Sequence, residues 1–326
     1  MKPNVSIILP FHRDLDSFLE SALESIRQSL DVKLQILLID DRRTLSKFKY
    51  SAKDTLVVKA EGSGYAAALN TGIRHAGSEY IALMNSDDLS HPSRLITQIS
   101  LIRSTGSSVS LCGIRNFGSA FAHRNVLGSA PKSFYSKKLL MLGAYGANAT
   151  LLGTSQFFVD KRWEDIDMSD WKFALDFYPN EVKESATSEI LYFYRRHKNQ
   201  VTQKSRTMST SLLDSLSNFS KNCGVDITSN AVAEALAAPF LFPKLEAFDQ
   251  DLFIRNLNLI YNIFSSDLSP TEFEELKPIL IRRLLLANNG RLLIPYLRSQ
   301  KPQLSQNDVI PTALKLFGDL FVRALR

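Results

Sequence analysis

The chain has 326 residues, of which 44% are apolar and 22% charged, so it carries enough apolar material for a core and is not disordered as a whole. Its net charge of +6 suits an anionic partner, but the basic residues are scattered, which argues against nucleic-acid binding. We find no apolar stretch long enough for a signal peptide or a membrane-spanning helix, and the two cysteines lack metal-ligand spacing. These features predict a cytoplasmic protein with reduced thiols.

Strand and helix patterns alternate over the first third of the chain. Apolar runs predict strands over residues 5–9, 34–39, 55–59 and 80–84, and helical spacing of apolar residues predicts helices over 15–26, 65–75 and 92–103. Alternating elements of this kind form a mainly parallel sheet with helices on both faces. The sequence therefore predicts an α/β domain with a Rossmann-like sheet.

Three of these strands are followed by short groups of residues that could face a ligand, Pro10-Phe11, Asp40-Asp41 and Asp87-Asp88, and the last two are acidic pairs. Because ligands bind beyond the carboxyl ends of parallel strands, the three groups predict a functional cleft. A carboxylate pair there suits Mg²⁺ or Mn²⁺, which prefer oxygen ligands and share their coordination with phosphates. The same acids also suit the capping of the helix that begins at Pro92.

The rest of the chain changes character twice. Residues 109–113 and 150–159 read as strands with a helix near 136–142 between them, and long helical patterns dominate beyond about residue 205. We therefore expect a separate all-α module over residues 205–326. Its last segment, 311–326, is amphipathic and would allow peripheral contact with the cytoplasmic face of a membrane, although packing on the module's own core is the simpler interpretation.

Four segments of the first hundred residues together resemble the family 2 glycosyltransferases of the GT-A fold. They read VSIILPF at 5–11, LLIDD at 37–41, GYAAALNTGI at 64–73 and AGSEYIALMNSDD at 76–88, in the order and spacing of that family. A weaker likeness extends to about residue 202. The resemblance implies a GT-A domain over residues 1–204, followed by the helical module.

The resemblance also implies an activity. Such an enzyme transfers a sugar from a nucleotide-diphosphate donor, a UDP-sugar foremost, to a hydroxyl group of a saccharide or lipid-linked acceptor. It works with Mn²⁺ or Mg²⁺ and by direct displacement with inversion, as in the synthesis of cell-surface polysaccharides or other glycans.

On the donor side, the resemblance carries over to individual positions. Pro10 and Phe11 would line the nucleotide pocket through their backbone, and Asp40 would meet the base or ribose. Asn70 stands where the family has a polar residue near the donor. These four positions are the expected nucleotide side of the site.

The expected metal position lies in Asn85-Ser86-Asp87-Asp88, which resembles the DxD motif of the family. Asp88 is the preferred metal ligand, and Asp87 is expected to contact the donor. Asn85 stands where the family often has an acid, so its contact with the donor sugar or ribose is expected to differ.

The segment 194–202, YRRHKNQVT, resembles the closing segment of the family's catalytic domain. Arg195 or Arg196 would bind the diphosphate, because a guanidinium group matches phosphate geometry. His197 would complete the metal shell or contact phosphate. A solvated basic loop is an equally good interpretation of these residues.

Asp170 is the candidate catalytic base, since Ser169-Asp170-Trp171 resembles the acidic pair that precedes an aromatic residue in the family. Ser169 departs from the usual glutamate. One carboxylate near the acceptor hydroxyl would accept its proton. Capping of the helix that begins at Trp171 is the alternative role, and nearby acids that compete for the assignment are Glu164, Asp165 and Asp167.

Two other functions stay open at this stage. A sugar nucleotidyltransferase also places a metal at a strand end, but such enzymes begin with a glycine-rich phosphate loop, and residues 10–13, PFHR, contain no glycine. The departures at Arg42, Asn85 and Ser169 also allow a catalytically degenerate module that binds or scaffolds without transferring a sugar.

Overall fold

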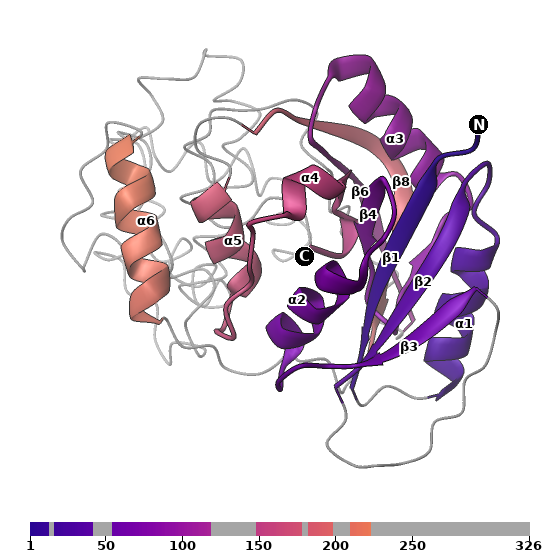
Figure 1. Cartoon of the computed structure of the whole chain (residues 1–326), viewed down its shortest axis with the longest axis horizontal. Helices are drawn as coiled ribbons and strands as arrows, with labels where there is room; N and C mark the ends of the chain where they lie inside the picture. Colours follow the sequence, from indigo (N-terminus) through magenta and orange to yellow (C-terminus); the bar gives the residue numbers. More distant parts are fainter. Residues whose placement is uncertain (13–15, 42–53, 119–147, 178–181, 198–208, 223–326) are drawn as a thin grey trace, which may run out of the picture. The chain divides into compact units, whose positions relative to one another are not determined.

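The computed structural model describes residues 1–12, 16–41, 54–118, 148–177, 182–197 and 209–222 (Figure 1). Contacts within the chain group it into two units, Met1–Lys204 and Ser205–Arg326. In the second unit the described element is helix α6 (Thr210–Asn222). The expected helix near 136–142 and the amphipathic segment 311–326 lie outside the described residues.

The first unit is built on one mixed sheet, in which neighbouring strands run in the order β3-β2-β1-β4-β7-β6-β8-β5. The strands are β1 (Asn4–Phe11), β2 (Lys33–Asp40), β3 (Thr55–Lys59), β4 (Tyr80–Leu83), β5 (Leu89–Ser90), β6 (Val109–Gly118), β7 (Leu152–Thr154) and β8 (Glu184–Arg196).

The two halves of this sheet differ in direction. Strands β3, β2, β1 and β4 are parallel to their neighbours, whereas β7 is antiparallel to both β4 and β6. Strand β8 returns parallel to β6, and short β5 pairs with it in the antiparallel sense. The predicted mainly parallel α/β sheet is confirmed.

Helices cover the sheet on both faces (Figure 1). The helices of the first unit are α1 (Asp16–Arg27), α2 (Tyr65–His75), α3 (Arg94–Thr105), the short α4 (Ser155–Phe158) and α5 (Ser169–Phe177), together with the 3-10 turn η2 (Asn148–Thr150). Successive side chains of a strand point to opposite faces. Val5, Ile7 and Leu9 of β1 accordingly share one buried cluster with Leu23 of α1 and Ile99 of α3.

The opposite face of β1 receives α2. Gly72 of α2 lies against the side chain of Ile8, where any Cβ atom would collide. The absence of a side chain at this position therefore lets the helix approach the strand closely. This contact fixes the position of α2 along β1, and the first residues of α2 lie at the carboxyl edge of the sheet.

The strand expected over residues 150–159 is confirmed only over Leu152–Thr154, and its second half is wrong. The chain instead forms η2, strand β7 and helix α4 in succession. The Thr154 hydroxyl accepts a hydrogen bond from the Phe157 backbone at 3.3 Å, so Thr154 caps a helix and ends the strand.

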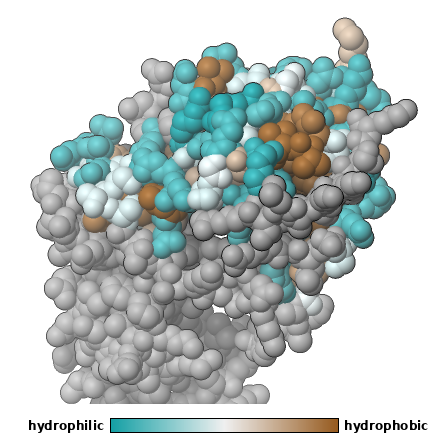
Figure 2. All heavy atoms as spheres, turned by 60° about the horizontal axis from the view of Figure 1, so that its bottom comes forward, coloured by the Kyte–Doolittle hydropathy of each residue, from teal (hydrophilic) through white to brown (hydrophobic). Residues whose placement is uncertain are grey.

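Polar residues cover most of the described surface on the face shown in Figure 2, with hydrophobic residues in a few separate patches. Large hydrophobic residues that are exposed in the described part include Leu30, Leu56, Tyr65 and Val159. Among the described helices, we find none with the length and apolar character needed to cross a bilayer.

Candidate active site

The carboxyl ends of β1, β2 and β4 meet at one edge of the sheet, as predicted. Phe11 is paired with Asp40 in the register of β1 and β2, and the Asp41 backbone donates to the Phe11 carbonyl at 3.0 Å. The side chain of Asp41 accepts from the Gly64 backbone at 3.0 Å. Asp41 therefore ties the end of β2 to the start of α2, which is a role that sequence reasoning did not assign.

Of the residues expected to line the nucleotide pocket, Pro10 and Phe11 are buried and Asp40 is half-buried. The Phe11 ring belongs to the core cluster of the sheet. The carbonyls of Phe11 and Asp40 already accept hydrogen bonds from the backbones of Asp41 and Ala60, each at 3.0 Å.

We call residues Asn85–Asp88, which follow β4, the acid loop. Asp88 is fully buried, and both of its carboxylate oxygens accept hydrogen bonds. One oxygen accepts from the Tyr192 hydroxyl at 2.7 Å and from the Asn85 amide at 2.9 Å, while the other accepts from the Arg195 backbone at 2.7 Å. Asp88 thereby fastens the acid loop to strand β8 from inside.

Burial also sets the protonation chemistry around Asp88. Its pKa is raised, mainly by burial and further by the neighbouring charge of Asp87, while the three hydrogen bonds act in the opposite direction. Burial, together with the charge of Asp88, raises the pKa of Tyr192 well above its usual range. Tyr192 therefore stays protonated and can keep donating to the carboxylate.

The side chain of Asp87 is less deeply buried than that of Asp88. Its carboxylate lies 2.8 Å from Nε2 of His197, and the side chains of Asp87 and His197 are 15% and 20% exposed. Within the described residues, no group of three or more His, Cys, Asp or Glu side chains is close enough to hold a metal alone. An oxygen and a nitrogen ligand at this separation nevertheless fit Mn²⁺ or Mg²⁺ when donor phosphates and water supply the remaining ligands.

Arg195 lies between two aromatic rings beside the acid loop. Its guanidinium is 4.3 Å from the ring centre of Phe18 in α1 and 4.5 Å from that of Phe117 in β6. Its Nε donates to the Asp87 carbonyl at 2.6 Å. Two rings, one carbonyl and the backbone bond to Asp88 thus fix this arginine, which acts as a clamp on the acid loop.

A buried arginine on another element, Arg94, also contacts this region. Arg94 of α3 is only 1% exposed, and it donates to the carbonyls of Leu83 at 2.9 Å and Ala149 at 2.8 Å. Its guanidinium also lies 4.9 Å from the ring centre of Tyr192. Arg94 consequently joins the end of β4 to the tyrosine that holds Asp88.

Asp170 lies in the first turn of α5, where its carboxylate accepts from the Trp171 backbone at 2.9 Å. Tyr65 connects it electrostatically to the acid loop. The pKa of the Tyr65 phenol is raised by burial and then by the charges of Asp170, Asp88 and Asp87, although 38% of the residue is exposed.

Comparison with known proteins identifies this arrangement. The sequence model of Glycosyl transferase family 2 matches residues 6–160, which include β1, β2, β4 and the acid loop. Over these residues the chain is similar to this family, and its relatives carry the same class of name.

Three relatives of this chain carry glycosyltransferase names. The putative glycosyltransferase EpsE of Bacillus subtilis (strain 168) is 27% identical over 230 residues, covering 64% of this chain and 78% of EpsE. The bifunctional glycosyltransferase pgtA of Dictyostelium discoideum is 30% identical over 125 residues, and an uncharacterized glycosyltransferase of Rickettsia felis is 32% identical over 100 residues. The matches span 31% and 29% of this chain but only 16% of each of those two relatives.

Solved structures confirm the expected GT-A fold of this glycosyltransferase. Residues 1–349 of S. aureus TarS in complex with UDP-GlcNAc superpose with a TM-score of 0.55 at 15% identity, covering 89% of this chain and 82% of that one. The TarS complex with UDP gives a TM-score of 0.54, with 91% and 92% covered. At this identity the likeness shows the fold alone.

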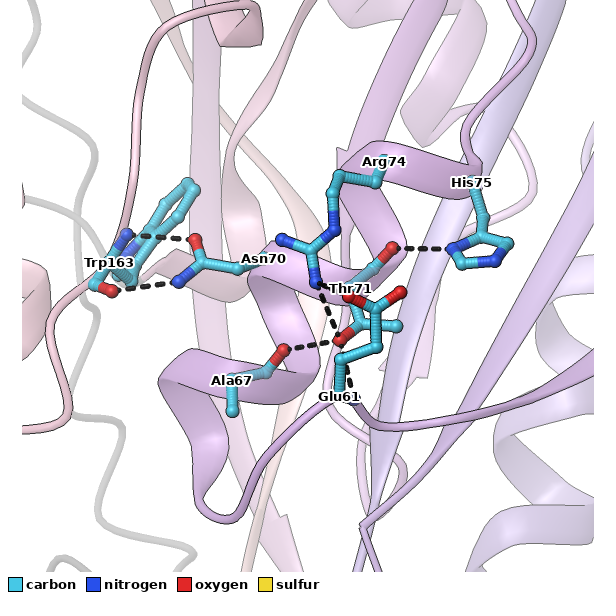
Figure 3. A network of polar contacts seen from close by, with 7 residues as sticks. All are labelled: Glu61, Ala67, Asn70, Thr71, Arg74, His75 and Trp163. Carbon is cyan, nitrogen blue, oxygen red and sulfur yellow. Dashed lines mark hydrogen bonds and ion pairs between the residues drawn. The ribbon is translucent and has the colours of Figure 1, made fainter.

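The environment of Asn70 differs from the expected one. Its amide nitrogen donates to the Trp163 carbonyl at 2.8 Å, and its amide oxygen accepts from the Trp163 backbone at 2.9 Å (Figure 3). Both ends of the amide are thus engaged with a backbone 93 residues away. Asn70 thus holds the segment before α5 against α2, and both polar atoms of its side chain are used in this contact.

The acids near Asp170 are also distinguished by their contacts. Glu164 forms an ion pair with Lys172 at 2.7 Å, and Asp165 packs against Gly64 at the start of α2. Asp170 remains the member of this group that influences Tyr65 beside the acid loop. Sequence reasoning had no signal for Tyr192 or Phe18, because their roles depend on partners far away in the chain.

Proposed function

We propose that this chain transfers the sugar of a nucleotide-diphosphate donor, a UDP-sugar foremost, to a hydroxyl group of a saccharide or lipid-linked acceptor. The match to the family-2 model supports the activity, and the TarS structures with UDP and UDP-GlcNAc support the donor class. The observation that carries the proposal is the acid loop at the carboxyl edge of the sheet, which lies within the segment that matches the family model and whose Asp87 carboxylate lies 2.8 Å from His197.

Asp87 and His197 are the proposed ligands of Mn²⁺ or Mg²⁺, and Asp87 replaces Asp88 in this role. Both oxygens of Asp88 already accept hydrogen bonds from donors of the protein, whereas Asp87 is partly exposed beside a nitrogen ligand. When bound, the cation supplies positive charge that stabilises the departing diphosphate. Asp88 contributes by keeping the acid loop attached to β8.

Asp170 is the proposed base. Its carboxylate accepts the proton of the acceptor hydroxyl while that oxygen forms a bond to the anomeric carbon of the donor sugar. The bond from the same carbon to the diphosphate oxygen breaks, and the nucleoside diphosphate leaves with the electron pair. One displacement from the face opposite the leaving group inverts the anomeric configuration.

The first test is the thermal stability of the full chain with UDP, GDP, CDP and dTDP, each with and without Mn²⁺. A ligand at about 100 times its dissociation constant adds about 2.7 kcal/mol to the free energy of unfolding. We expect UDP with Mn²⁺ to raise the melting temperature by a few degrees, and Asp87→Ala to abolish this effect. If none of the four nucleotides stabilises the protein, the degenerate binding module becomes the better interpretation.

A further inference from the structure

The position of Tyr65 in the molecule is unusually constrained. The preceding residue, Gly64, has φ of +96°, a backbone conformation that residues with a side chain rarely adopt. A Cβ atom at Gly64 would lie 2.5 Å from the carboxylate of Asp165, and the Gly64 backbone donates to Asp41. The start of α2 is therefore held from two sides, and Tyr65 is its first residue.

The hydroxyl of Tyr65 is anchored as well. It donates to the amide oxygen of Asn85 at 3.2 Å, while the amide nitrogen of Asn85 donates to Asp88 at 2.9 Å. These two bonds fix the orientation of the Asn85 amide, because only its nitrogen can donate to the carboxylate. Tyr65 is nevertheless 38% exposed, so an aromatic ring with a fixed hydroxyl remains accessible beside the acid loop.

The start of α2 also connects the two sides of the proposed reaction. Tyr65 contacts the acid loop, where the diphosphate would leave, while Gly64 and Asn70 contact the segment that leads to Asp170. In a direct displacement the anomeric carbon lies between the leaving group and the acceptor hydroxyl. The transferred sugar must therefore lie between the acid loop and Asp170.

We propose that Tyr65 contacts the transferred sugar of the donor and is a specificity-determining residue for it. This inference rests on the proposed function. An aromatic side chain suits the role because it offers an apolar face with little conformational freedom, and sugar rings present C–H groups on one face. The hydrogen bond to Asn85 prearranges the ring, so little ordering is needed on binding.

The test measures dissociation constants by calorimetry on the full chain, with Mn²⁺ present throughout. The ligands are two pairs, UDP with UDP-GlcNAc and GDP with GDP-mannose, and the readout is the ratio of the two constants within a pair. Tyr65→Ala is expected to weaken binding of the nucleotide sugar by about tenfold and of the nucleoside diphosphate by less than about twofold. Tyr65→Phe keeps the ring and is expected to keep most of the ratio.

Two further variants control this comparison. Leu30→Ala removes a similarly exposed apolar side chain outside the site and should leave both constants unchanged. Tyr65→Leu keeps apolar bulk while removing the aromatic face, so it serves if the alanine variant does not fold, and it should also lower the ratio.

The outcomes separate this inference from the function on which it rests. A ratio that Tyr65→Ala and Tyr65→Leu leave unchanged overturns the inference while donor binding by the wild type stands. Equal weakening of both members of a pair also overturns it, because Tyr65 would then serve the nucleotide. A wild type that binds none of the four ligands refutes the proposed function together with the inference.

Discussion

The two halves of the sheet contribute differently to the site. The parallel half supplies the acid loop and the strand ends, which lie close together in sequence and are recognisable there. The mixed half supplies what holds and completes them, namely Tyr192, Arg195 and His197 of the β8 end, more than a hundred residues from their partners. A reactive motif and its supports are thus separate parts of the chain, and each can be altered without the other.

The largest expected effect concerns Asp170, which stands on α5 beyond β7. Asp170→Asn preserves the shape of the side chain but removes the base, so we expect transfer to fall about a thousandfold. Nucleotide binding with Mn²⁺ should stay within about twofold of the wild type, because the donor side is intact. The transfer rate is measured as release of nucleoside diphosphate in the presence of a panel of saccharide acceptors, and nucleotide binding is measured by calorimetry. Undiminished transfer by Asp170→Asn would remove this residue from the mechanism.

The next effect separates two adjacent acids. Asp88→Ala leaves three inward-facing donors without their acceptor and should lower the free energy of unfolding by about 3 kcal/mol. Asp87→Ala should lower it by only about 1 kcal/mol, the usual net contribution of one hydrogen bond, here the bond to His197, yet abolish metal-dependent stabilisation by UDP. Urea denaturation of both variants provides the comparison. The reverse pattern would restore Asp88 as the metal ligand.

A smaller effect is expected at the clamp. Arg195→Lys keeps the charge but loses the planar group that stacks between Phe18 and Phe117. We expect a loss of about 1.5 kcal/mol in the free energy of unfolding and weaker binding of UDP with Mn²⁺. Arg196→Lys is the matched control, since that guanidinium lies over one ring, at 5.6 Å from the centre of Tyr194. Equal effects of the two substitutions would contradict the clamp.

The smallest effect tests the departure at position 85. Asn85→Asp restores the acid common in the family but places a carboxylate beside Asp88 and removes a donor to it. The two neighbouring carboxylates repel each other, which raises the pKa of the pair in the folded state. The free energy of unfolding of the variant should therefore fall as pH rises through that raised pKa. We expect a deficit of about 1 kcal/mol at pH 8 that shrinks towards pH 5. A deficit independent of pH would assign the effect to geometry.

Sequence reasoning predicted the strand ends well because each predicted strand is a local apolar run that stops at polar residues. It could not distinguish Asp87 from Asp88, since the outward or inward direction of two adjacent side chains depends on Tyr192 and the Arg195 backbone. The contact of Asn70 could not be predicted for a similar reason, because its partner Trp163 lies 93 residues further along the chain.

The buried guanidinium of Arg94 makes a residue of the scaffold important for activity. A random-mutagenesis screen for lost transfer would return substitutions at this position, although the residue is almost inaccessible to solvent and belongs to a helix of the scaffold. Those hits would resemble folding defects. They would differ from ordinary core defects because Arg94 contacts Tyr192, which binds Asp88 of the acid loop. Such variants should lose transfer activity while they still unfold in one cooperative thermal transition.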